Sequence, residues 1–161
     1  MYFVETSALL KAYVTERGSD TVTAAFQRLR GSLFTSELVA IETLARLTRL
    51  RRSRIITRLA YRKLKREFEL DLSELFRIAP VAPETLSAAL ELVHGYRTTA
   101  ASGIDLVHLA TLEHLQSLYP PEAVRLMCSD GALGNVAVAR GVKVFNPETD
   151  ELGLLPSAAP N

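Results

Sequence analysis

Cysteine is almost absent from this sequence: its 161 residues include only Cys128. A lone cysteine cannot form a disulfide within the chain, and no cysteine and histidine spacing is typical of a zinc site. Because a chain of this length buries about 70% of its unfolded surface, a hydrophobic core is enough to stabilise it. Cys128 lies in an apolar segment, so we expect a buried, unreactive thiol.

Long apolar runs are also missing. No segment approaches the ~20 consecutive apolar residues that a membrane-spanning helix needs. Residues 1–5 lack the basic region of a signal peptide and already include an acid, Glu5. With 48% hydrophobic and 23% charged residues, the composition is that of a folded domain. We therefore expect a cytoplasmic protein without a membrane partner.

Acidic residues are missing from the segment 46–66, which contains ten basic residues. The chain has 19 basic and 18 acidic residues in all, so the remainder carries nine basic residues against eighteen acids. A polyanion such as RNA could bind the basic segment, and so could an acidic segment of a partner protein. A solvated pair of helices whose arginines only border an apolar stripe is the third interpretation.

Short β-favouring segments alternate with helical patterns along the chain. The pattern predicts strands at residues 2–4, 33–35, 75–79, 124–128 and 142–145. It predicts helices at residues 8–14, 19–30, 37–50, 55–68, 84–93, 104–118 and 130–140. This alternation is typical of an α/β fold in three layers, with a central parallel sheet of about five strands and helices on both faces. We expect one domain over residues 1–147 and a loose C-terminal tail over residues 148–161.

The expected first strand is not followed by a glycine-rich phosphate-binding loop, because the chain continues as Glu5-Thr6-Ser7-Ala8. P-loop and dinucleotide-binding domains are therefore excluded. In an open parallel sheet, ligands bind beyond the carboxyl ends of the strands, where the strand order reverses. Glu5 ends the first expected strand and Asp130 follows the fourth, so both acids fall where a site is expected.

Four acids have unusually apolar or small neighbours: Glu5, Glu42, Asp105 and Asp130. An acid on a solvated helix normally has charged neighbours, so these carboxylates are expected to be partly buried and to need a cation or hydrogen bonds. Mg²⁺ and Mn²⁺ prefer oxygen ligands of this kind. Such ions, held by several carboxylates, can activate a water molecule and stabilise a phosphodiester during in-line displacement. Glu37, five residues earlier, is the alternative candidate for the place that Glu42 has in this set of acids.

The segment 3–14, Phe-Val-Glu-Thr-Ser-Ala-Leu-Leu-Lys-Ala-Tyr-Val, resembles the opening of the PIN-domain nucleases, especially the VapC-type toxins of toxin–antitoxin pairs. Three later stretches resemble the same family in the same order: 36–42, 104–110, and 128–130 with 141–147. The resemblance implies a PIN-like fold, RNA cleavage dependent on Mg²⁺ or Mn²⁺, and inhibition by a cognate antitoxin.

The same resemblance implies a catalytic and metal-binding set of acids, which is Glu5, Glu42, Asp105 and Asp130. It implies a metal-dependent endoribonuclease, the toxin of a VapBC-type pair, whose products carry a 5′-phosphate and a 3′-hydroxyl. A homodimer bound to a VapB-like antitoxin is the implied assembly, and the apolar faces of the two helices between residues 37 and 68 are candidate contacts.

Several polar side chains are candidates for supporting roles. Thr6, Ser7 and Ser129 could orient a carboxylate or a bound water, although capping of the first helix explains a hydroxyl there equally well. His108 shares a helix face with Asp105 and could bind a metal, but a buried, hydrogen-bonded histidine is the commoner outcome. The expected contacts with RNA phosphates are Arg49, Arg51 and Arg52.

Two positions depart from the family pattern. Glu5 stands where the family usually has aspartate, and the extra methylene displaces the carboxylate by roughly 1–1.5 Å at a site where ~0.5 Å matters. Cys128 stands where the family often has threonine or serine. A catalytically impaired protein that only binds RNA or its antitoxin is therefore the alternative. A housekeeping nuclease without an antitoxin, and an unrelated domain in which the four acids never converge, are two further hypotheses.

Overall fold

The computed structural model describes residues 1–95, 100–120 and 123–156. Its strands form one sheet in the order β3-β2-β1-β4-β5, and every neighbouring pair is parallel. The strands are β1 (Tyr2–Val4), β2 (Leu33–Ser36), β3 (Phe76–Ala79), β4 (Arg125–Met127) and β5 (Val144–Phe145). The predicted parallel sheet of about five strands is therefore confirmed.

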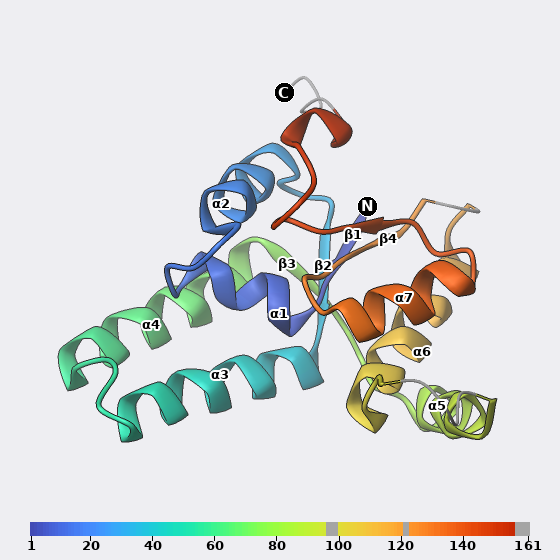
Figure 1. The fold of residues 1–161 in the computed structure, drawn as a ribbon, viewed down its shortest axis with the longest axis horizontal. Helices are drawn as coiled ribbons and strands as arrows, with labels where there is room; N and C mark the ends of the chain where they lie inside the picture. The colour runs from blue at the N-terminus through green and yellow to red at the C-terminus, as the bar shows by residue number, and fades with distance from the viewer. Residues whose placement is uncertain (96–99, 121–122, 157–161) are drawn as a thin grey trace.

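Helices cover both faces of the sheet, which confirms the expected three layers: in Figure 1, α1 to α4 lie on one side of the strands and α5 to α7 on the other. The α-helices are α1 (Thr6–Leu9), α2 (Ser19–Arg28), α3 (Glu37–Arg52), α4 (Arg58–Glu74), α5 (Pro83–Gly95), α6 (Gly103–Leu118) and α7 (Gly131–Ala139). Two 3-10 turns, η1 (Leu10–Ala12) and η2 (Leu152–Leu154), complete the described elements.

The central strands are mainly apolar because helices cover both of their faces. In β1, Tyr2, Phe3 and Val4 are all buried, and so are Leu126 and Met127 of β4. The edge strand β3 differs, because its two middle residues are exposed. The carboxyl ends of β1 and β4 therefore lie side by side in the core. The strand order reverses here: β2 and β3 follow β1 on one side, and β4 and β5 lie on its other side.

Side-chain caps fix where the functional helices begin. Ser36 Oγ accepts a hydrogen bond from the backbone N–H of Val39, which starts α3 at Glu37. Ser102 and Asp105 form a reciprocal capping box that starts α6. A serine directly before an apolar helical segment is a typical helix start, and both serines have that position in the sequence. Asp105 is therefore held in the first turn of α6, and Glu42 lies in the second turn of α3.

The first helix differs from the prediction of a helix at residues 8–14. The helix α1 begins at Thr6, and a 3-10 turn follows it at Leu10–Ala12. The reason is the side chain of Glu5, which accepts a hydrogen bond from the Ser7 N–H and so caps the helix two residues before its predicted start. Glu5 thus directly follows β1 and caps the start of α1.

The chain beyond residue 147 is packed as far as residue 156, whereas the sequence predicts a loose tail from residue 148. Arg28 of α2 donates hydrogen bonds to the carbonyl oxygens of Leu152, at 2.9 Å, and Pro156, at 2.6 Å, and Leu155 is buried. The φ angle of Gly18 is +86°, and a Cβ atom there would lie 2.8 Å from the carbonyl oxygen of Pro147. Residues 157–161 of the predicted tail lie outside the described part of the chain.

None of the helices in the described segments combines the length and the apolar character needed to cross a membrane.

Candidate active site

The four acids singled out from the sequence line one hollow of about 630 Å³. Glu5 directly follows β1, and Asp130 lies three residues after the end of β4. These strands are neighbours, and they mark the position in the order β3-β2-β1-β4-β5 at which the strand sequence reverses. Glu42 reaches the hollow from α3 and Asp105 from α6. The chain therefore brings together acids that are up to 125 positions apart, from Glu5 to Asp130.

Glu5 is the most buried of the four carboxylates, with 5% of the residue exposed. Its Oε2 accepts hydrogen bonds from the backbone N–H of Ser7 at 2.9 Å and from the Ser7 hydroxyl at 2.5 Å. Burial raises the pKa of Glu5 above its ordinary value, and the bonds from Ser7 only partly oppose that rise. No lysine or arginine of the described residues forms an ion pair with Glu5, so no basic side chain offsets the cost of burying its charged form.

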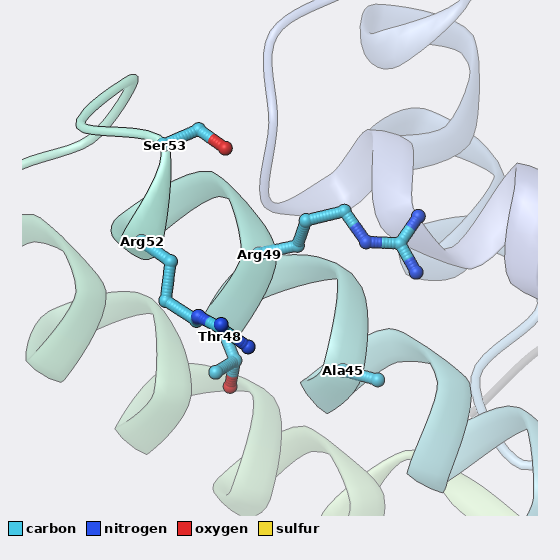
Figure 2. Close-up of a pocket in the computed structure, with 5 residues that line it drawn as sticks. All are labelled: Ala45, Thr48, Arg49, Arg52 and Ser53. Atoms are coloured by element: carbon cyan, nitrogen blue, oxygen red, sulfur yellow. The ribbon is translucent and has the colours of Figure 1, made fainter.

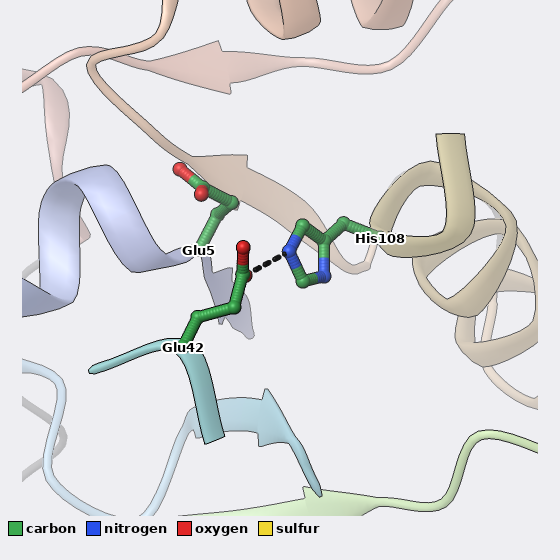
Figure 3. A group of neighbouring side chains, drawn as sticks. All are labelled: Glu5, Glu42 and His108. Atoms are coloured by element: carbon green, nitrogen blue, oxygen red, sulfur yellow. Dashed lines mark hydrogen bonds and ion pairs between the residues drawn. The ribbon is translucent and has the colours of Figure 1, made fainter. Parts of the chain in front are cut away.

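Glu42 lies beside Glu5 and is held by two donors. Its Oε2 accepts hydrogen bonds of 2.7 Å from Thr6 Oγ1 and from His108 Nε2. Figure 3 shows Glu42 between Glu5 and the imidazole, with the bond to His108 dashed. Burial alone would raise the pKa of Glu42, but the bonds from His108 and Thr6 outweigh it and hold the pKa below its ordinary value. Glu42 is therefore ionised at neutral pH.

Asp105 and Asp130 each cap the start of a helix. Asp105 Oδ2 accepts a hydrogen bond of 2.6 Å from the backbone N–H of Ser102. Asp130 Oδ1 accepts one of 2.9 Å from the backbone N–H of Leu133. Both side chains are half-buried. Helix capping therefore fixes the direction of these two carboxylates without any contribution from a ligand.

All four carboxylates share one arrangement: one oxygen is held by hydrogen bonds, and the other accepts none from the described residues. One ligand atom each from Glu5, Glu42 and His108 lie within 4.8 Å of one another. A buried, ionised carboxylate without a cation costs free energy, and a hard divalent cation removes that cost. Asp105 and Asp130 line the same hollow but do not belong to this close group. The carboxylate oxygens of Glu5 and Glu42 are the type of ligand that Mg²⁺ and Mn²⁺ prefer.

The hydroxyl groups expected to support the site make specific contacts. Thr6 donates to Glu42, as described above. The Ser7 hydroxyl donates to Glu5 and accepts hydrogen bonds from the backbone N–H groups of Ser129, at 2.8 Å, and Asp130, at 3.1 Å. Ser7 thus ties the end of β1 to the loop after β4. The buried Ser129 hydroxyl has no hydrogen-bond partner among the described residues.

Cations border the hollow on one side. Lys11, which is buried, forms an ion pair with Glu148 at 2.6 Å and a longer one with Glu16 at 3.3 Å. Arg46 and Arg49 of α3 line the same hollow and are exposed. Lys11 is matched by two acids, so the two arginines supply the accessible positive charge beside the four carboxylates.

A second hollow of about 700 Å³ continues along α3, lined by Ala45, Thr48, Arg49, Arg52 and Ser53. Figure 2 shows Arg49 extending from α3 towards the N-terminal part of the chain, while Arg52 leaves the helix in a different direction. Arg49 lines both hollows, so it connects the basic helix with the acidic site. Arg51 lines neither of these two hollows.

The structure also decides between candidate residues that the sequence left open. Glu37, the alternative to Glu42, is exposed in the first turn of α3 and does not line the acidic hollow. Cys128 is buried, as expected, and burial raises the pKa of its thiol. His108 is buried and hydrogen-bonded, which confirms the commoner interpretation. Its bond to Glu42 and the place of Arg46 were not predicted, because both depend on contacts between distant segments.

We expect Glu5→Gln to stabilise the protein in EDTA at pH 7.5. Replacing a buried ionisable carboxyl group that has no cationic partner should gain at least about 1 kcal/mol, or roughly 2–4 °C in unfolding midpoint. Folding raises the pKa of Glu5. This group therefore does not destabilise the wild type below its unfolded pKa of ~4.3, and the wild type loses that part of its stability as pH rises through the folded pKa. The variant's advantage should therefore be small at pH 4.5 in thermal melts. An equal advantage at both pH values would contradict this account.

The comparisons with known proteins agree with this geometry. A family model of the PIN domain matches residues 2–118. The match covers more than half of the chain, so the protein belongs to the PIN-domain family. No curated protein matches the sequence.

Solved structures share the fold at low sequence identity. VapC20 of Mycobacterium tuberculosis, described as a sarcin–ricin loop cleaving toxin, has a TM-score of 0.64 and 18% identity over 84% of this chain and 95% of its own. FitAcB from Neisseria gonorrhoeae has a TM-score of 0.68 and 14% identity over 93% and 100%. A toxin–antitoxin complex from Klebsiella pneumoniae has a TM-score of 0.62 and 13% identity over 91% and 98%. At these identities the likeness shows the fold alone.

Proposed function

We propose that this protein is a metal-dependent endoribonuclease and the toxin of a VapBC-type toxin–antitoxin pair. The observation that carries the proposal is the convergence of Glu5, Glu42, Asp105 and Asp130 on one hollow, each with one carboxylate oxygen held and one free. Membership of the PIN-domain family supports nuclease chemistry. The description of VapC20 as a toxin that cleaves the sarcin–ricin loop supports RNA as the substrate.

The four acids are the proposed ligands of Mg²⁺ or Mn²⁺. When bound, such an ion lowers the pKa of a water molecule and stabilises charge on a phosphodiester. The chain's own groups hold the acids in place: Ser7 fixes Glu5, and the helix starts of α6 and α7 fix Asp105 and Asp130. Because these restraints exist before an ion or substrate arrives, little reorganisation is needed when they bind.

The exposed arginines of α3 are the proposed path for the RNA backbone. Arg46 and Arg49 border the acids, and Arg49 and Arg52 line the second hollow. Their guanidinium groups can bind phosphates on either side of the cleaved bond. Arg51 remains a proposed RNA contact, but its position outside both hollows makes it a weaker candidate than Arg49.

Arg49→Gln should weaken RNA binding and reduce its salt dependence, whereas Arg51→Gln should change both much less. For single-stranded RNA, the slope of log K against log salt falls by about 0.7 for each phosphate that the protein no longer neutralises. Fluorescence anisotropy with a labelled RNA, in EDTA to prevent cleavage, measures that slope between 50 and 200 mM salt. Equal slopes for the two variants would contradict the proposed path.

An antitoxin and a second copy of the chain are the proposed protein partners. Large apolar side chains are exposed on and between α3 and α4, including Ile41 at 64%, Ile55 at 69% and Leu59 at 78%. Ile41 belongs to α3 and Leu59 to α4, and Ile55 lies in the connection between them. All three fall within residues 37–68, whose apolar faces were expected to contact a partner. The Klebsiella pneumoniae neighbour is described as a toxin–antitoxin complex, which supports an antitoxin as the partner.

The experiment that tests the proposed function is cleavage of a pool of structured RNAs by the partner-free protein with Mg²⁺, Mn²⁺ or EDTA. We expect cuts that require the metal and leave 5′-phosphates, detected by ligation to the new ends. Asp105→Asn, purified in parallel, excludes a contaminating nuclease. Equal cutting by this variant would contradict the proposal, and RNA binding without cutting would favour the impaired, binding-only alternative.

A further inference from the structure

We propose that His108 is a positioning residue of the metal site: its Nε2–H holds one oxygen of Glu42, so that the other oxygen faces the ion. This inference rests on the proposed metal site and gives a role to a residue outside the four acids assigned to it. His108 does not touch the ion or the RNA in this account. It acts through Glu42.

The first argument is the geometry of the bond. His108 Nε2 lies 2.7 Å from Glu42 Oε2, between α6 and α3, and 1% of His108 is exposed. Glu42 is ionised and can only accept hydrogen bonds, so Nε2 must carry the proton and donate it. A hydrogen bond to a charged acceptor is roughly twice as strong as one between two neutral groups.

The second argument is the other ring nitrogen. Nδ1 of His108 is buried and has no hydrogen-bond partner among the described residues. A buried N–H without an acceptor costs about 1–3 kcal/mol, whereas an unpaired lone pair on a neutral ring costs less. The surroundings of the ring therefore favour a proton on Nε2 rather than on Nδ1, and Nε2–H is the donor that can hold Glu42.

The third argument is how little else restrains Glu42. Its side chain is 28% exposed and has three rotatable bonds. Besides His108, the only described donor to its carboxylate is Thr6 Oγ1, which bonds to the same oxygen. Two donors on Oε2 leave Oε1 for the hollow, and loss of His108 leaves one flexible hydroxyl bond. Hydrogen-bonding partners of metal ligands typically contribute 10–100-fold to metal affinity.

The experiment compares two variants of the full chain, His108→Gln and His108→Asn, by Mn²⁺ titration with electron paramagnetic resonance. The amide nitrogen of glutamine can reach the position of Nε2, whereas the shorter asparagine places its amide near Nδ1. We expect His108→Asn to weaken Mn²⁺ binding by about 10–100-fold and His108→Gln to stay within about threefold of the wild type. Equal affinities for all three proteins would overturn this proposal and leave the acidic site intact.

Two measurements on the wild type keep the test independent of the folding of any variant. Nitrogen-15 NMR should show the proton of His108 on Nε2, and a proton on Nδ1 alone would overturn the proposal. Electron spin echo spectroscopy of bound Mn²⁺ should show no directly coordinated nitrogen, and coupling to a histidine nitrogen would make His108 a ligand instead. Failure of the wild type to bind Mn²⁺ would remove the metal site and this proposal together.

Discussion

Glu42→Gln is expected to lower RNA cleavage by at least about 100-fold. Removing a group that only supports a metal ligand typically costs 10–100-fold, so the loss of a ligand's charge should cost no less. Glutamine keeps the shape of glutamate, and its carbonyl oxygen can still accept the hydrogen bonds from Thr6 and His108. The loss should therefore appear in the rate of cleavage, with the fold unchanged by circular dichroism.

Glu37→Gln is the matched control for Glu42→Gln. Both residues belong to α3, but Glu37 is exposed and lies outside the acidic hollow. Its replacement should leave cleavage within about twofold, because surface substitutions change free energies by about 0.5 kcal/mol or less. If the two variants lost cleavage to a similar extent, the assignment of Glu42 to the site would be wrong.

Asp130→Asn is expected to have an equally large effect on cleavage with almost none on stability. Asp130 caps α7 through the Leu133 N–H, and asparagine caps helices as well as aspartate does. The substitution removes the negative charge proposed to bind the ion and keeps the cap. We expect cleavage to fall by about 100-fold or more, while the free energy of unfolding in EDTA, from urea melts, stays within about 0.5 kcal/mol.

Asp130→Ala separates the two roles of this residue. Alanine removes the cap as well as the charge, so it should lose about 1 kcal/mol of stability in EDTA. The cleavage rate of the alanine variant should match that of the asparagine variant. An Asp130→Asn protein that still cleaved RNA at the wild-type rate would show that Asp130 has a structural role only. A strongly destabilised Asp130→Asn protein would show that the charge of Asp130, and not only its cap, stabilises the fold.

Stability and function oppose each other at Glu5. Its carboxylate is buried, and its pKa is raised because burial disfavours the charge. A chain selected only for stability would have an uncharged residue here. The bond network from Ser7 to Glu5 and to the backbone of Ser129 and Asp130 keeps the carboxylate in place despite this cost.

Much of the fold could be predicted from local patterns. The central strands are short apolar runs next to helix-capping residues, so the positions of β1 and β2 and the caps Ser36 and Ser102 follow from neighbouring residues alone. Glu5 and Asp130 could be placed because parallel strands share one carboxyl edge. The resemblance of the motifs to the PIN family then linked Glu42 and Asp105 to the same site.

The parts that could not be predicted depend on contacts between distant segments. His108 and Glu42 are 66 positions apart, and Lys11 and Glu148 are 137 apart. No periodicity in the sequence indicates such pairs, because each residue is ordinary in its own helix or loop. The packing of residues 148–156 could not be predicted for the same reason. Arg28 and Lys11, which contact this segment, lie near the other end of the chain.

The most direct test of the central claim, that these acids form one metal site, is Mn²⁺ binding by isothermal titration calorimetry to the wild type and Asp105→Asn. Asp20, an exposed acid of α2, provides the control variant Asp20→Asn. We expect saturable binding to the wild type that Mg²⁺ competes for, the same binding to the control, and at least about tenfold weaker binding to Asp105→Asn. Equal affinity for Mn²⁺ in all three proteins would contradict the claim.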